Sequence, residues 1–238
     1  FAPWIQQIKD NRIEKDFFNI GFPYKQPGGD KIEGYEIRGY GSFKRKATGT
    51  NSTTAAWIVD FSKNNNPQDI KHVFFAESAY DIMAFYQANK AKLQGELDKS
   101  VFVSIGGTFS NQQVAGIMNY YSHARAVDCF DNDIPGRIYG MRMVGVVEKV
   151  PLSINQHDKM IDVNYNGVTH ILDAETANLH SLRPIIPFKR EYGIEKAPAA
   201  FKDWNDVIQN KPSTIILSKN KYERDENLRE RRTGGIKM

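Results

Sequence analysis

Four acidic side chains follow two short apolar runs of the sequence and could share one site. Glu77 ends one apolar run, and Asp131 and Asp133 end another. Because side chains at positions i and i+2 of an extended chain point the same way, Asp131 and Asp133 can face one point. Asp81 lies one helical turn after Glu77 and can reach back toward the same place.

Carboxylates that converge repel one another unless a cation neutralises them. Sites made only of oxygen ligands favour Mg²⁺ or Mn²⁺, held together with water and substrate phosphates. A structural alternative stays open for each feature, because Asp-Asn-Asp-Ile-Pro-Gly at 131–136 is also good turn and helix-cap chemistry. A glutamate at a strand end is commonly just solvated. The two features together favour a metal site.

The elements that must position these carboxylates alternate between strand and helix. Apolar runs predict strands, and Ser78, Ser110 and Pro135 suit helix starts. Alternation of this kind predicts an α/β fold with a parallel sheet, in which ligands bind beyond the carboxyl ends of the strands. The predicted strands are 72–76, 101–105 and 126–130, and the predicted helices begin near 79, 111 and 134 and carry apolar residues at helical spacing.

Residues 1–66 are predicted to form a small α+β domain that precedes a domain at 67–217. The small domain is expected to open with a helix, continue through a Gly- and Pro-rich loop at 21–30, and end as a meander of three strands. These strands are 34–38, 42–46 and 55–61. Within the second domain we expect an insertion or irregular extension at 151–198, with compact structure resuming at 201–208 and 214–217. Residues 218–238 are predicted to form a charged tail.

The ordered series of motifs resembles the Toprim domain, which bacterial DnaG-type primases, topoisomerases and certain nucleases share. The resemblance rests on Glu77-Ser-Ala-Tyr-Asp81, on Ser104-Ile-Gly-Gly-Thr108, and on Asp131-Asn-Asp133 with Gly136 behind it. Lys202-Asp-Trp-Asn-Asp206 resembles a late Lys-Asp motif of the primase branch. The similarity covers roughly residues 70–217 and is greatest to primase-like proteins of plasmids and conjugative elements.

This resemblance implies a Toprim-type parallel-sheet domain with a divalent-metal site at Glu77, Asp131 and Asp133, which Asp81 and Asp203 support. All five acids are therefore predicted to be catalytic, with Mg²⁺ or Mn²⁺ as cofactor. Glu77 or Asp81 is also expected to orient water or a 3′-hydroxyl. The sequence departs from the family pattern where Ser78 replaces a common glycine and where Asn205 replaces a second acid of replicative primases.

A second set of residues is expected to contact nucleic acid or phosphate. Arg38, Lys44 and Lys46 would grip the template backbone in the leading interpretation, or belong to a solvated loop in the structural one. Gly106 and Gly107 would let the backbone approach a phosphate, or would only make a tight turn. Arg137 and Lys202 would contact phosphates near the metal, or remain surface charges.

The composition of the 238-residue chain narrows the class of protein further. No apolar run approaches the ~20 residues of a membrane helix, so we expect a soluble, cytoplasmic protein without a membrane partner. One cysteine, Cys129, excludes an internal disulfide framework and a Cys-based zinc site within these residues. The net charge of +4 is concentrated in the tail at 218–238, where seven Lys and Arg residues face four acids.

The resulting hypothesis is a divalent-metal-dependent nucleic-acid enzyme, with DNA primase-like nucleotidyl transfer as the leading activity. Single-stranded DNA template and nucleotides are the expected partners, with replication or mobilisation proteins as further candidates. Because no zinc module is found in these residues, two alternatives remain open. One is a Toprim-type nuclease or phosphohydrolase, and the other is a non-catalytic nucleic-acid-binding accessory.

Overall fold

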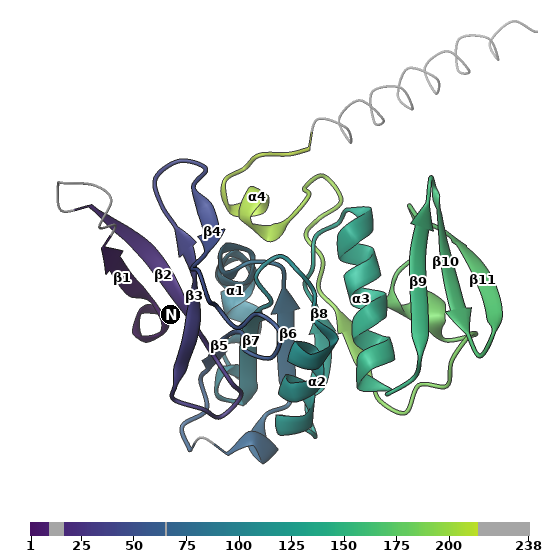
Figure 1. Ribbon diagram of the computed structural model, residues 1–238, viewed down its shortest axis with the longest axis horizontal. Coiled ribbons are helices and arrows are strands. Elements are labelled where there is room, and N and C mark those ends of the chain that lie inside the picture. The colour runs from purple at the N-terminus through teal and green to yellow at the C-terminus, as the bar shows by residue number, and fades with distance from the viewer. Residues whose placement is uncertain (10–16, 65, 214–238) are drawn as a thin grey trace, which may run out of the picture.

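A five-stranded sheet lies at the centre of the computed structural model, which describes residues 1–9, 17–64 and 66–213 (Figure 1). The strand order is β12-β8-β6-β7-β5. Only β5 runs antiparallel to its neighbour, and the other four strands are parallel. The predicted α/β class with a mostly parallel sheet is therefore confirmed. The strands are β5 (Trp57–Asp60), β6 (His72–Ala76), β7 (Ser100–Ser104), β8 (Arg125–Asp128) and β12 (Tyr192–Ile194).

Helices connect the parallel strands, and their starts agree with the sequence prediction. Ser78 caps α1 by accepting a hydrogen bond from the Asp81 N–H, and Asp133 caps α3, with Pro135 in its first turn. Ser110 stands at the cap position of α2, but its hydroxyl instead donates to the Thr53 carbonyl at 2.7 Å. The helices are α1 (Ala79–Leu93), α2 (Asn111–Tyr120), α3 (Ile134–Val147) and α4 (Trp204–Ile208).

Alternating strand residues build a separate core on each face of the central sheet. Val73 and Phe75 pack with α2 and α3 on one face. Phe74 and Ala76 pack with α1, α4 and residues of the N-terminal segment on the other. Both faces of β6 are covered in this way, which explains why the run at 72–76 is apolar without alternation.

The N-terminal segment forms a four-stranded antiparallel sheet in the order β1-β2-β3-β4. The predicted opening helix is wrong, because only a single 3₁₀ turn, Ala2–Trp4, precedes a strand. The predicted loop at 21–30 is also wrong at its start. Gly21 packs closely against the Ile8 side chain, and Phe22 and Tyr24 are fully buried. The strands are β1 (Gln6–Lys9), β2 (Phe18–Lys25), β3 (Ile32–Arg38) and β4 (Lys44–Lys46).

The strand predicted at 55–61 exists as β5, but it does not belong to the N-terminal meander. It pairs with β7 in the central sheet, where Trp57 and Val59 are fully buried. The Trp57 indole N–H also donates to the Trp4 carbonyl at 2.7 Å, which ties the start of the chain to this sheet. The domain boundary at 66/67 stays a prediction.

The segment at 151–198 is more regular than expected. It contains a three-stranded antiparallel sheet and then β12, which joins the central sheet. Asp158 and the Asn166-Gly167 pair have positive φ angles of 51°, 51° and 79°, which suits the tight turns between the strands. Ile161 and Val163 are fully buried and anchor this sheet to the main core. The three strands are β9 (Leu152–His157), β10 (Met160–Tyr165) and β11 (Val168–Asp173).

Two predictions fall wholly outside the described residues, namely the compact piece at 214–217 and the tail at 218–238. Among the helices of the described segments, none has the length and apolar character needed to cross a membrane.

Gly106 and Gly107 offer a matched test of how the N-terminal sheet packs on the central one. Both have positive φ angles, of 73° and 90°. A Cβ at Gly106 would clash with the Tyr24 hydroxyl, whereas one at Gly107 meets open space. Gly107→Ala should therefore lower the free energy of unfolding by about 1–2 kcal/mol through backbone strain alone. Gly106→Ala should cost about 1–3 kcal/mol more, because it also overpacks the interface. Urea denaturation measures both, and equal losses would contradict this packing.

Candidate metal centre

Three carboxylates meet at the carboxyl edge of the central sheet. Glu77 follows β6, and Asp131 and Asp133 follow β8, its neighbour in the sheet. One oxygen atom from each side chain lies within 4.8 Å of the other two. The structure thus brings together the three residues that the sequence predicts as metal ligands.

The loop between β8 and α3 is fixed by hydrogen bonds from its backbone and from the Asn132 side chain. Asp133 Oδ1 accepts the Gly136 N–H at 2.9 Å, so its second oxygen can face the cluster. The Asn132 side-chain amide donates to the carbonyls of Ala197 and Phe201, both at 2.8 Å. Asn132 also donates its backbone N–H to the Lys202 carbonyl at 2.7 Å. The metal-ligand loop and the late Lys-Asp motif are therefore held as one unit.

Burial and mutual repulsion make these carboxylates hard to ionise. Burial first, and then the charges of Asp131 and Asp133, raise the pKa of Glu77 to about 7. Burial first, and then the charge of Asp81, raise the pKa of Asp131 to about 7, although Lys202 opposes the shift. A cation at this point would favour the ionised forms.

Lys202 supplies part of that positive charge. Its Nζ lies 3.2 Å from Asp131 Oδ2 and 3.2 Å from Asp133 Oδ2, and its side chain is 50% exposed. Burial lowers the pKa of Lys202, but the two carboxylates outweigh burial, so the net pKa is raised.

The donor set fits a hard divalent cation. Besides the oxygen that meets Lys202, Asp131 has a buried Oδ1 without any hydrogen-bond partner. A buried acceptor of this kind is costly unless something else satisfies it. Carboxylate oxygens are the ligands that Mg²⁺ and Mn²⁺ use, with water and substrate oxygens completing the coordination. The three carboxylates, one of which has an unpartnered oxygen, therefore suit either ion.

Asp81 and Asp203 lie around the cluster but are bound to other partners. Asp81 is buried and accepts the hydroxyl of Ser78. Burial raises the pKa of Asp81 to about 6, the Ser78 hydroxyl opposes this, and the charge of Asp203 adds to it. Asp203 caps α4 by accepting the Asp206 N–H at 2.7 Å. Supporting roles for both acids remain predictions.

Two basic residues of β3 and β4, Arg38 and Lys44, act electrostatically on acids of this site. The charge of Lys44 helps to lower the pKa of both Glu77 and Asp81, and that of Arg38 also acts on Asp81. Arg38 is held by Glu36 Oε1 at 2.8 Å and lies over the Tyr80 ring, with 5.0 Å to the centroid. Lys46 is half-buried, and burial lowers its pKa. Template contacts through Arg38, Lys44 and Lys46 stay predictions.

The remaining predicted phosphate contacts find other partners in the structure. The Gly107 N–H donates to the Glu77 carbonyl at 2.8 Å, and the Gly106 N–H donates to Ser104 Oγ at 3.3 Å. These bonds and the close packing of Gly106 on Tyr24 favour the tight-turn alternative for the two glycines. Arg137 Nη1 donates to the Ala177 carbonyl at 3.1 Å, which directs it toward the segment after β11. Phosphate binding by these three residues stays a prediction.

The structure also shows a buried ion pair that the sequence reasoning missed. Lys196 Nζ lies 2.6 Å from Asp128 Oδ1 and donates to the carbonyls of Phe130 and Asp131 at 3.0 and 3.3 Å. It therefore fixes the backbone that carries the Asp131 ligand. The two partners are 68 residues apart in sequence, so no local motif could have joined them.

A comparison with protein-family models identifies the class of domain to which this site belongs. Residues 74–166 match the family described as Toprim-like. The matched segment includes Glu77, Asp131 and Asp133 but neither the N-terminal sheet nor Lys202. The chain thus contains a Toprim-like domain, a type of domain typical of metal-dependent nucleic-acid enzymes that transfer phosphoryl groups. No curated protein and no solved structure matches the chain.

The raised pKa values predict how stability varies with pH when no metal is bound. Unfolded carboxyl groups lose their protons near the ordinary values of 4.5 for Glu and 3.8 for Asp, whereas folded Glu77 and Asp131 keep them until about pH 7. Between these values the folded state binds more protons, so its stability should fall as the pH rises. Thermal unfolding in EDTA should show this fall, Asp131→Asn should flatten it, and Mg²⁺ should restore stability at the alkaline end. A wild-type profile as flat as that of Asp131→Asn would contradict the account.

A double-mutant cycle tests the Lys196–Asp128 pair. Lys196→Met leaves the buried Asp128 carboxylate unpaired and should lower the free energy of unfolding by about 3–5 kcal/mol. Adding Asp128→Asn removes that uncompensated charge and should recover much of the loss. Urea denaturation of the two single variants and the double variant measures the coupling. Additive losses would show that the pair does not act as one unit.

Proposed function

We propose that the chain is a divalent-metal-dependent nucleic-acid enzyme whose activity is primase-like nucleotidyl transfer. The observation that carries the proposal is the cluster of Glu77, Asp131 and Asp133 within 4.8 Å, inside a Toprim-like domain. Basic residues of a separate sheet face this cluster, which suits a polyanionic substrate. Single-stranded DNA and nucleotides are the proposed partners.

Glu77, Asp131 and Asp133 would hold the metal, which supplies Lewis-acid stabilisation of phosphate oxygens and of the charge that develops on them. Lys202 is half-exposed, and within the described residues its ammonium group pairs with Asp131 and Asp133. With a cation at these carboxylates, the Lys202 ammonium group would be available to contact a substrate phosphate.

Asp81 suits a proton-accepting role beside the cluster. Its pKa of about 6 lies close to neutral pH, where a general base is most effective. Its carboxylate already accepts a hydrogen bond from a hydroxyl, that of Ser78. An attacking 3′-hydroxyl would replace or share this bond. Lys44 and Arg38 would meanwhile place the template backbone along β3 and β4.

The activity is tested with a single-stranded template, labelled nucleotides and Mn²⁺ or Mg²⁺. We expect labelled oligomers from the wild-type chain, and a loss of at least about a hundredfold in Asp131→Asn and in Glu77→Gln, because each removes one metal ligand. Asp98→Asn is the matched control, since this acid lies in the turn before β7, away from the cluster. It should keep full activity.

Two other outcomes would contradict the primase proposal. Shortening of the template, lost in the same two variants, would identify a nuclease that uses the same carboxylates. Neither product, with nucleic-acid binding retained, would indicate a non-catalytic accessory. Oligomers that persist in Asp131→Asn would place the active site elsewhere.

A further inference from the structure

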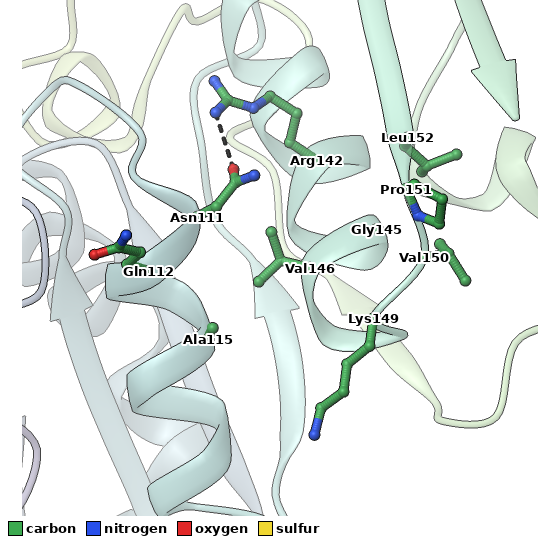
Figure 2. A pocket seen from close by; sticks show the side chains of 10 residues that line it. All are labelled: Asn111, Gln112, Ala115, Arg142, Gly145, Val146, Lys149, Val150, Pro151 and Leu152. Atoms are coloured by element: carbon green, nitrogen blue, oxygen red, sulfur yellow. Dashed lines mark hydrogen bonds between the residues drawn. The ribbon is translucent and has the colours of Figure 1, made fainter.

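A groove of about 470 Å³ runs between α2, α3 and the start of β9. Figure 2 shows Asn111 and Ala115 on α2 facing Arg142 and Val146 on α3, with Lys149 just after the end of α3. The side chains include apolar, amide and cationic groups. None of its ten lining residues is an acid.

The absence of acids extends to both helices that wall this α2–α3 groove. Neither Asn111–Tyr120 nor Ile134–Val147 contains an Asp or Glu, although the chain has 28 acids in 238 residues. Glu148, the residue after the end of α3, is buried and accepts hydrogen bonds from the Tyr192 hydroxyl and from backbone N–H groups at 189 and 190. The groove lining therefore carries two cations, Arg142 and Lys149, and no acid.

Arg142 is held in place before any ligand arrives. Its guanidinium lies over the Phe109 ring, 4.5 Å from the centroid, and Nη2 donates to Asn111 Oδ1 at 3.0 Å. No carboxylate of the described residues forms an ion pair with it. A fixed guanidinium with unused donors and no counter-charge is suited to a phosphate.

Helix α3 runs from the metal centre to the groove. This helix begins at the capping residue Asp133, one of the three clustered acids. Tyr139 follows, and its hydroxyl donates to the carbonyl of Gly107, whose N–H donates to the Glu77 carbonyl. Tyr139, Arg142 and Val146 share one face of α3, which spans about 10 Å at 1.5 Å per residue, and Lys149 follows just after the helix ends, with a φ angle of 57°.

We propose that the α2–α3 groove holds the backbone of single-stranded nucleic acid that enters or leaves the metal centre. This inference deepens the proposed function and rests on it. Arg142 and Lys149 would contact phosphates, while Ala115 and Val146 offer apolar surface to the sugars and faces of unpaired bases. A single strand presents such apolar faces along its length, which favours it over a duplex.

The test measures binding of a fluorescent single-stranded oligonucleotide in EDTA, as a function of salt concentration. Arg142→Gln with Lys149→Gln should weaken binding by about tenfold or more. It should also reduce the salt slope by about 1.4, because each phosphate that the protein neutralises contributes about 0.7. The matched control is Arg183→Gln with Lys90→Gln. Arg183 also lies over a phenylalanine ring, that of Phe188, and Lys90 is an exposed lysine of α1. This control should change binding less than twofold.

Each outcome supports or overturns the inference. Because Lys149 is exposed, Lys149→Glu serves as a second variant that cannot act through the Phe109 packing, and it should weaken binding as well. Unchanged affinity and salt slope in both groove variants overturn the proposal. So does groove-dependent binding of an acidic peptide without groove-dependent binding of the oligonucleotide, which would indicate a protein partner. Because binding is measured without metal, a chain that forms no product can still show the groove effect, and an active chain can lack it.

Discussion

The repulsion among three carboxylates held within 4.8 Å is the constraint on which the rest of the structure depends. Left alone, Glu77, Asp131 and Asp133 would separate or stay protonated. The protein resists separation through the fold itself, because adjacent strands deliver these residues to one edge and a helix cap fixes Asp133. Lys202 neutralises the negative charge only in part, and one buried oxygen of Asp131 has no hydrogen-bond partner. This incomplete compensation is what distinguishes a ligand site from a cluster of structural acids.

Charge is segregated around this centre. The charge of Lys44 on β4 acts on Glu77, and the acid-free helix α3 leads from the cluster to the α2–α3 groove. The modest net charge of +4 therefore conceals a negative centre with positive surroundings. In the proposed function, such an arrangement would attract a polyanion to the edges of the site. The N-terminal sheet is part of this arrangement, since Ser104 of β7 donates to Glu36 of β3 at 3.2 Å.

The sequence predicted what local pattern and spacing control. The central strands, the starts of α1 and α3, and the convergence of Glu77 with Asp131 and Asp133 all follow from apolar runs and capping residues. It could not predict contacts between distant segments. Burial of Trp57 places β5 in the central sheet, and burial of Phe22 and Tyr24 stabilises a strand in a Gly- and Pro-rich stretch. Lys196 pairs with Asp128, which lies 68 residues away in the sequence. The groove was missed for the same reason, because it requires two helices to be placed side by side.

The central claim is that the three carboxylates hold a divalent cation. Titration of Mn²⁺ followed by the electron paramagnetic resonance signal of the free ion tests it most directly, at a pH above 7 where Glu77 and Asp131 can ionise. We predict saturable binding by the wild-type chain and by Asp98→Asn, and loss of that binding in Asp131→Asn and in Glu77→Gln. Unchanged Mn²⁺ binding in the last two variants would contradict the claim, as would the absence of binding by the folded wild-type chain.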